Sequence, residues 1–153
     1  MRLSAEGLKF LQSQEGLRLH PYQDVAANWT IGYGHLMTDE ETQKWPEGSE
    51  ITEGEALLLL ESDVTETEDA INRLVQTPLS QPQFDALVDF VFNIGIDAFQ
   101  YSTLLDDLND GNIAMAAAQF PHWDHAGGRV IGALFERRMA EQRMFLNGIG
   151  VQT

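Results

Sequence analysis

The sequence predicts an α+β fold that is mainly α, with a small β-sheet lobe and a larger helical lobe. Residues 17–35 are rich in β-forming residues, turn residues and glycines, a composition typical of a small antiparallel sheet. Residues 53–76 repeat apolar side chains at alternating steps of three and four, which favours one helix of more than twenty residues. We expect this helix to join the two lobes and a ligand-binding cleft to lie between them.

The first predicted element is a helix with recognisable ends. Ser4 is suited to cap its N-terminus, and Gly16 is suited to stop it, because glycine tolerates the left-handed conformation of a helix end. The predicted sheet follows directly. Residues 36–50 are acidic and contain proline and glycine, so we expect irregular chain with at most a short helical turn.

The middle of the chain predicts two further helices. Thr52-Glu-Gly-Glu55 is a capping box that opens the long helix, and Gln76-Thr-Pro78 ends it. Ser80-Gln-Pro-Gln83 caps the next helix, which is apolar nearly all round and is therefore expected to be buried. Gly95 closes that helix.

The C-terminal part predicts three more helices. A short helix starts at Ser102 and ends at Asn109-Asp-Gly111, another runs over residues 112–118, and the last covers residues 132–146. No repeat or low-complexity linker interrupts the chain. We therefore expect residues 1–153 to form a single domain: a small lobe at 14–52, a bridging helix at 53–76, and a helical lobe at 77–153 that includes the N-terminal helix.

Composition excludes several classes of site. The chain has no cysteine, so a disulfide framework, a thiol nucleophile and a thiolate metal site are all excluded. Its net charge is −15, with −10 over residues 36–76 and −7 over residues 77–128. We interpret these acids as a solvated face. Nucleic-acid binding is not expected, because no basic patch with interleaved aromatic residues exists.

No targeting or metal-binding motif is apparent. The longest apolar run, Ala56–Leu60, is too short for a membrane span, and the first nine residues lack the apolar core of a signal peptide. His122 and His125 could share a helical face, but no third ligand accompanies them. We expect neither stable membrane insertion nor a metal or other cofactor.

The most informative stretch runs from Glu15 through Asp24 to Thr30, with the spacing E-x8-D-x5-T. A glutamate at a helix end and an aspartate in a strand turn can hold one protonated and one ionised carboxyl group, as cleavage of a glycosidic bond requires. For Glu15 alone the alternative is an ordinary solvent-facing residue, for Asp24 a simple turn cap, and for Thr30 a residue favoured by its strand propensity.

With its surroundings, this motif resembles the phage-type lysozymes, the endolysins of glycoside hydrolase family 24. The resemblance covers nearly the whole chain through Glu15-Gly-Leu-Arg18, Tyr22-Gln-Asp24, Thr30-Ile-Gly-Tyr-Gly-His35, Phe90-Val-Phe-Asn-Ile-Gly95, Phe99-Gln-Tyr-Ser-Thr-Leu-Leu105, Leu108-Asn-Asp-Gly111, Trp123-Asp-His-Ala-Gly-Gly128 and Gly132-Ala-Leu-Phe-Glu-Arg-Arg138. It implies a lysozyme-like fold, with Glu15 as the general acid, Asp24 as the base or electrostatic stabiliser, and Thr30 as the residue that positions the water.

The resemblance also implies the substrate and the surface that binds it. It predicts a muramidase that cleaves the β-1,4 bond between N-acetylmuramic acid and N-acetylglucosamine of bacterial peptidoglycan with inversion. The two carboxyl groups should then lie about 6.5–9.5 Å apart. Gly34, Leu36, Phe99 and Gln100 are the implied substrate-binding residues, although core packing remains an alternative for Phe99. Glycine in this strand admits either a sugar or another backbone.

Several alternatives remain open. The chain could instead be a lytic transglycosylase or a non-catalytic module that binds peptidoglycan. Arg137 or Arg138 could pair with Glu15, and Glu141 lies within reach of both arginines along one helix. We expect a monomer that stays in the host cytoplasm until it is released to the cell wall. The turn Val25-Ala-Ala-Asn28 lacks the glycine usual in this family, so its shape should differ.

Overall fold

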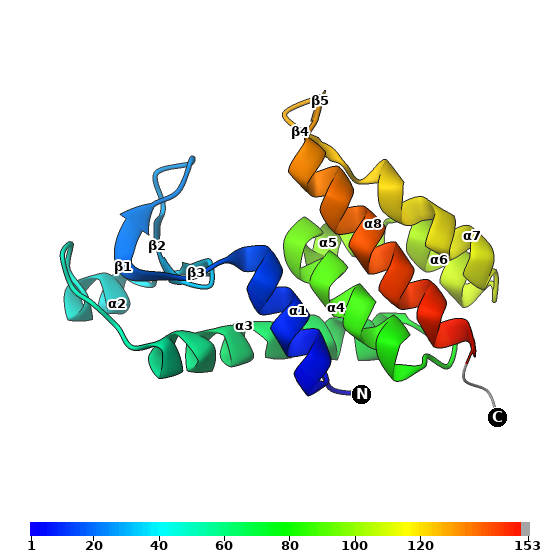
Figure 1. The fold of residues 1–153 in the computed structure, drawn as a ribbon, viewed down its shortest axis with the longest axis horizontal. Helices are drawn as coiled ribbons and strands as arrows, with labels where there is room; N and C mark the ends of the chain where they lie inside the picture. The colour runs from blue at the N-terminus through cyan, green and yellow to red at the C-terminus, as the bar shows by residue number, and fades with distance from the viewer. Residues whose placement is uncertain (151–153) are drawn as a thin grey trace. The chain divides into compact units, whose positions relative to one another are not determined.

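The computed structural model describes residues 1–150 and confirms a mainly α fold with small antiparallel sheets (Figure 1). Two compact units are present: one contains Leu11–Glu66, here the sheet unit, and the other contains Met1–Phe10 with the chain from Thr67 onward, here the helical unit. The elements are α1 (Ala5–Glu15), β1 (Arg18–Gln23), β2 (Trp29–Gly32), β3 (His35–Leu36), α2 (Asp39–Lys44), α3 (Glu53–Leu74), α4 (Gln81–Ile94), α5 (Ile96–Gln100), α6 (Thr103–Asn109), α7 (Ile113–Gln119), η1 (Phe120–His122), β4 (His125–Ala126), β5 (Arg129–Val130), α8 (Gly132–Asn147) and η2 (Gly148–Gly150).

Local signals in the sequence set most helix ends. The hydroxyl of Ser4 accepts the N–H of Gly7 at 3.0 Å, and Gly16 follows α1 with a φ of 71°. Capping boxes open α3 at Thr52 and α4 at Ser80, as predicted. The long helix α3 contributes its first part to the sheet unit and its last part, from Thr67, to the helical unit.

The sheet unit contains the antiparallel strands β1, β2 and β3 in that order. Its sheet packs against α3 at Gly32, where an added Cβ atom would lie 3.3 Å from Cβ of Ala56. Gly32 also has a φ of 69°, which L-residues avoid. The close approach predicted for this glycine is therefore to a helix. The guanidinium carbon of Arg18 lies 4.3 Å from the centroid of the Tyr22 ring, and this cation–π contact stabilises β1.

His35 joins three elements of the sheet unit. Its Nδ1 lies 2.8 Å from Asp63 Oδ2 on α3, and its Nε2 lies 2.8 Å from Glu41 Oε2 on α2. The hydrogen bond with Asp63 and then that with Glu41 outweigh partial burial, and together they raise the pKa of His35 to about 9. His35 thus forms structural ion pairs that hold β3, α2 and α3 together.

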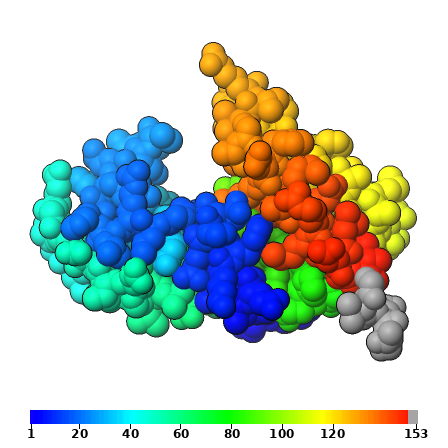
Figure 2. Space-filling model, in the orientation of Figure 1, coloured from blue at the N-terminus to red at the C-terminus, as the bar shows by residue number. Residues whose placement is uncertain are grey.

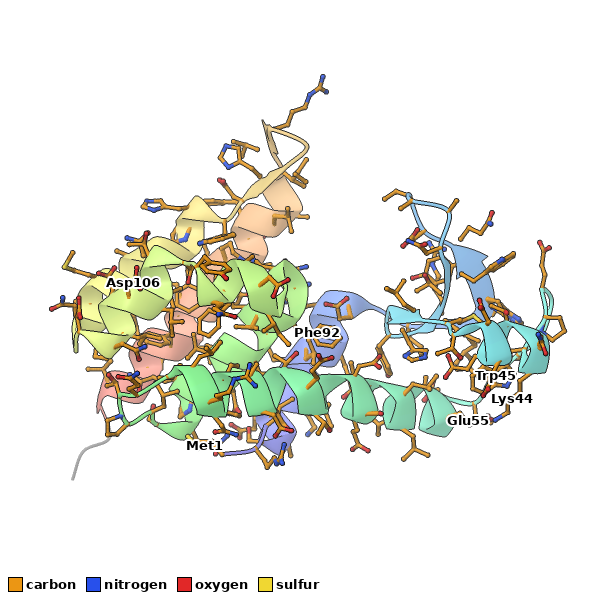
Figure 3. The ribbon with its side chains drawn as sticks, turned by 180° about the vertical axis from the view of Figure 1, so that it is seen from behind. Met1, Lys44, Trp45, Glu55, Phe92 and Asp106 are labelled. Atoms are coloured by element: carbon orange, nitrogen blue, oxygen red, sulfur yellow. The ribbon has the colours of Figure 1, made fainter. Side chains whose placement is uncertain are left out.

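The short helix α2 falls in the segment expected to be irregular. Thr38 and Glu41 form a capping box at its start, which offsets the weak helical pattern of the segment. At its end, Lys44 Nζ lies 4.6 Å from the ring centroid of Trp45 (both labelled in Figure 3). These local contacts explain why the segment holds a defined turn and a half of helix.

The helical unit is built around α4, which packs against α8. Nine consecutive residues of α4, from Gln83 to Val91, are buried, as its all-round apolar pattern predicted. The ring of Phe90 meets those of Phe120 and Trp123 edge-on at 5.0 and 5.8 Å. Trp123 therefore packs against the core of the helical unit.

Buried charges join α8 to α4. Arg137 donates two hydrogen bonds to Asp89, at 2.9 and 3.0 Å. Arg138 donates to Glu141 at 2.8 Å and to Asn93 at 2.9 Å. Burial, followed by the nearby Asp89 carboxylate, raises the pKa of Glu141. The predicted pairing of Glu141 with both arginines is confirmed.

Two features of the helical unit were not predicted. A separate short helix, α5, begins immediately after Gly95, where a backbone φ of 95° changes the direction of the chain. The hairpin of β4 and β5 turns at Gly127 and Gly128, which both have positive φ, and it stands out from the helical unit (Figure 2). A Gly-Gly pair is a known hairpin signal, so this element was detectable. Among residues 1–150, no helix combines the length and apolar character needed to cross a membrane.

Candidate active site

The three predicted catalytic residues all lie in the sheet unit. Glu15 is the last residue of α1, Asp24 follows β1, and Thr30 lies in β2. Within residues 1–150, no three His, Asp or Glu side chains are grouped so that they could hold a metal ion.

The half-buried side chain of Glu15 lies against the turn that joins β2 to β3. A Cβ atom added to Gly34 would lie 3.3 Å from Glu15 Oε2, and Gly34 has a φ of 75°. Glycine is thus required there for two reasons: the backbone conformation and the space taken by the carboxyl group. Gly34 was predicted to bind substrate, and the structure shows that its immediate neighbour is the predicted acid.

Asp24 closes the turn between β1 and β2. Its Oδ1 accepts the backbone N–H groups of Ala26 and Asn28 at 2.9 and 2.8 Å, and its Oδ2 accepts Asn28 Nδ2 at 3.4 Å. The backbone hydrogen bond from Asn28 is the main reason that the pKa of Asp24 is lowered. Asp24 is therefore a turn cap and also a carboxylate held in its ionised form.

The turn reaches this shape at some cost to the backbone. Ala27 has a φ of 62°, and it alone among the non-glycine residues of the described chain has a positive φ. Its N–H donates to the Asp24 carbonyl at 2.9 Å, and the N–H of Asp24 donates to the carbonyl of Asn28 at 2.9 Å. Ala27 is therefore the position of this turn at which a glycine would relieve backbone strain.

Thr30 lies next to the same turn. Its side chain is buried, with 3% of the residue exposed, and its Oγ1 donates a hydrogen bond to the carbonyl of Asn28 at 3.1 Å. Thr30 pairs with Tyr22 across the hairpin, whereas Asp24 is opposite Asn28. Asp24 and Thr30 are thus diagonal neighbours on one face of the hairpin, a relationship that usually spans about 7–8 Å.

Leu36 is the exposed residue that pairs with Thr30 across β2 and β3. It borders a hollow of about 360 Å³ whose walls also include Asn28, Trp29 and Asp39. An indole ring beside amide and carboxylate groups is a surface suited to a sugar, since it combines an apolar face with hydrogen-bonding groups.

The other two predicted substrate-binding residues lie in the helical unit, on α5. Gln100 is exposed and can contact a ligand. Phe99 is fully buried, with 0% of its surface accessible, so its side chain supports the surface from beneath and does not offer a face for a sugar. The core-packing alternative for Phe99 thus describes its position. That either Arg137 or Arg138 pairs with Glu15 stays a prediction.

Asn28 is the residue of this site that the sequence reasoning missed as an individual. Its backbone and side chain contact both Asp24 and Thr30. An Asn four residues after a turn-capping Asp was the available signal, since both residues commonly bond to turn backbones.

Known proteins resemble this chain along nearly all of its length. The family model described as phage lysozyme matches residues 12–141. The endolysin of Bacillus phage PZA is 40% identical over 150 residues, which cover 97% of this chain and 56% of that protein. The endolysin of Salmonella phage P22 is 40% identical over 147 residues, covering 96% of this chain and 99% of that protein.

A solved structure gives the same picture of the fold. The muramidase domain of SpmX from Asticaccaulis excentricus aligns with a TM-score of 0.85 at 39% identity, covering 95% of this chain and 97% of that domain. The present chain spans only a little more than half the length of the Bacillus phage endolysin.

Proposed function

Because the chain belongs to the phage lysozyme family, we propose that it is a muramidase that cleaves the β-1,4 bond between N-acetylmuramic acid and N-acetylglucosamine in bacterial peptidoglycan. The observation that carries the proposal is the arrangement of the β1–β2 turn. An ionised carboxylate, Asp24, and a hydroxyl group, that of Thr30, lie on one hairpin face, and a second carboxyl group, that of Glu15, lies in the same unit.

These groups have the chemistry that hydrolysis with inversion needs. Glu15 donates a proton to the bridging oxygen as the bond from the anomeric carbon to that oxygen breaks. A water held by Asp24 and Thr30 attacks the opposite side of the anomeric carbon and passes a proton to Asp24. Two carboxyl groups about 6.5–9.5 Å apart leave room for that water.

Substitutions of Glu15 and Thr30 test the assignment. Glu15→Gln keeps the shape of the side chain but removes the acid, so lysis of outer-membrane-permeabilised cells should fall by at least about 100-fold. Thr30→Ser should keep most activity, whereas Thr30→Val, which has a similar shape but no hydroxyl, should lose it. Undiminished lysis by Glu15→Gln would reject Glu15 as the acid.

Product analysis separates the enzyme classes. Mass analysis of digested peptidoglycan should show reducing muramic acid ends, and NMR of fresh product should show the inverted anomer. An anhydro-muramyl product would instead identify a lytic transglycosylase. Binding to peptidoglycan without any cleavage would identify a non-catalytic module.

The proposal extends to where the substrate lies and where the protein acts. Leu36 and the hollow beside Trp29 are proposed to hold a sugar ring next to the bond that is cleaved. Gln100, which is exposed on α5, is also proposed to contact the glycan. We also propose a monomer that needs no cofactor. It would remain in the host cytoplasm until it is released to the cell wall.

A further inference from the structure

One residue, Asn28, contacts both groups that are proposed to hold the attacking water. Its backbone N–H donates to Asp24 Oδ1 at 2.8 Å, and its side-chain Nδ2 donates to Asp24 Oδ2 at 3.4 Å. Its carbonyl oxygen accepts the hydroxyl hydrogen of Thr30 at 3.1 Å and the backbone N–H of Asp24 at 2.9 Å. Asn28 therefore links both groups at once, through its backbone and through its side chain.

We propose that Asn28 is a positioning residue, which sets the direction of the hydrogen bonds that Asp24 and Thr30 make with the attacking water. The inference rests on the proposed function and deepens it. Asn28 also borders the hollow proposed for a sugar ring, so KM reports any contact of its side chain with the glycan, and kcat reports its action through Asp24 and Thr30.

The contact with Thr30 decides what its hydroxyl group can do. A hydroxyl has one hydrogen and two lone pairs. Because that hydrogen is given to the Asn28 carbonyl, a water beside Thr30 meets an acceptor. The water must then donate one hydrogen to Thr30 and the other to the Asp24 carboxylate. A lone pair of the water is left to point at the anomeric carbon, as attack requires.

The contact with Asp24 decides which carboxylate oxygen receives the water. Oδ1 already accepts two backbone N–H groups, from Ala26 and Asn28. Oδ2 accepts the longer bond from the Asn28 amide and keeps capacity for a water. The hydrogen bonds of the Asn28 backbone would survive any substitution that preserves the turn. Mutation therefore tests the hydrogen bond from the side-chain amide of Asn28 to Asp24.

Asn28→Asp is the most direct variant, because it replaces a donor to Asp24 with a second carboxylate of nearly the same shape. The like charge should raise the pKa of Asp24, which must be ionised to accept a proton. The acid limb of the kcat/KM profile should therefore move up by about one pH unit, so that kcat falls about tenfold at pH values below the wild-type acid limb, with KM changed less than about twofold. Part of the loss should be recovered at higher pH.

Two further variants make the test independent of folding. Asn28→Ala removes the amide without adding charge and should lower kcat about threefold to tenfold, the effect of one lost hydrogen bond. Val25→Ala is the matched control, because Val25 is a fully exposed side chain in the same turn, and it should leave the profile unchanged. Thermal unfolding measured in parallel identifies any variant that has lost the fold. If Asn28→Asp is unfolded, the kcat of Asn28→Ala tests the positioning role.

The inference and the proposed function fail in different ways. If the profiles of Asn28→Asp and Asn28→Ala coincide with that of Val25→Ala while Glu15→Gln is inactive, the positioning role is overturned and the muramidase assignment stands. If the wild type binds peptidoglycan without cleaving the β-1,4 bond, the proposed function itself falls, and the role of Asn28 falls with it.

Discussion

Replacing Ala27 by glycine should stabilise the protein. Ala27 adopts a left-handed backbone, with a φ of 62°, in the turn that carries Asp24. For an L-residue this conformation costs about 1–2 kcal/mol, because Cβ crowds the following carbonyl. Glycine removes that crowding but adds conformational freedom to the unfolded chain, which costs about 0.5–1 kcal/mol. The balance predicts a gain of about 0.5–1 kcal/mol in the free energy of unfolding for Ala27→Gly.

Urea denaturation and thermal unfolding measure this gain. For a chain of this size the expected increase in Tm is about 1–4 °C. Ala26→Gly is the matched control, because Ala26 is exposed, lies in the same turn and has no positive φ. Only the entropic cost applies there, so Ala26→Gly should lose about 0.5–1 kcal/mol. If both substitutions lower stability equally, the left-handed strain inferred at Ala27 is absent and the reasoning is refuted.

Three more predictions follow from the site and its charges. Because the pKa of His35 is raised from 6.5 to about 9, its ion pairs stabilise the fold fully below pH 6.5 and the stabilisation is lost as pH rises through 9. After allowance for solvent screening this amounts to about 1–2 kcal/mol, so urea denaturation at pH 6 and pH 9.5 should show that loss in the wild type and not in His35→Gln. Gly34→Ala and Gly48→Ala both place an L-residue at a positive φ, so both should lower stability. Only the Cβ of Gly34→Ala would crowd Glu15 Oε2, so only this variant should lose kcat, by about tenfold or more. Equal kcat values for the two variants would contradict the inference that Gly34 makes room for Glu15. Residues 36–128 carry 19 acids and two bases, so hydrolysis of anionic cell walls should accelerate as ionic strength rises from low to moderate values, and a flat salt profile would count against repulsion.

Much of the fold follows from signals that act within a few residues. Ser4 and Gly16 bound α1 because a hydroxyl satisfies a free N–H at one end and a left-handed glycine ends the other. The capping boxes at Thr52 and Ser80 start α3 and α4 in the same way. The hairpin of β4 and β5 was equally local, and its Gly-Gly turn was overlooked.

The candidate site was predicted only in part, because much of its geometry depends on contacts between elements. The sequence singled out Glu15, Asp24 and Thr30, but it could not show that Gly34 makes room for Glu15. For Phe99 the sequence left core packing open beside sugar contact, and the structure shows the side chain wholly buried. An aromatic side chain looks the same in a sequence whether it faces solvent or the core.

The sequence by itself determined the fold class and most helix ends, since these depend on residue types at short spacings, and its resemblance to phage-type lysozymes pointed to the three residues proposed for catalysis. Tertiary structure decided what those residues touch. His35 binds Asp63, which is 28 positions away, and the carboxyl group of Glu15 lies against Gly34 in the turn after β2. The strength of a hydrogen bond depends steeply on its distance and angle, so its partners are fixed only once the chain has packed.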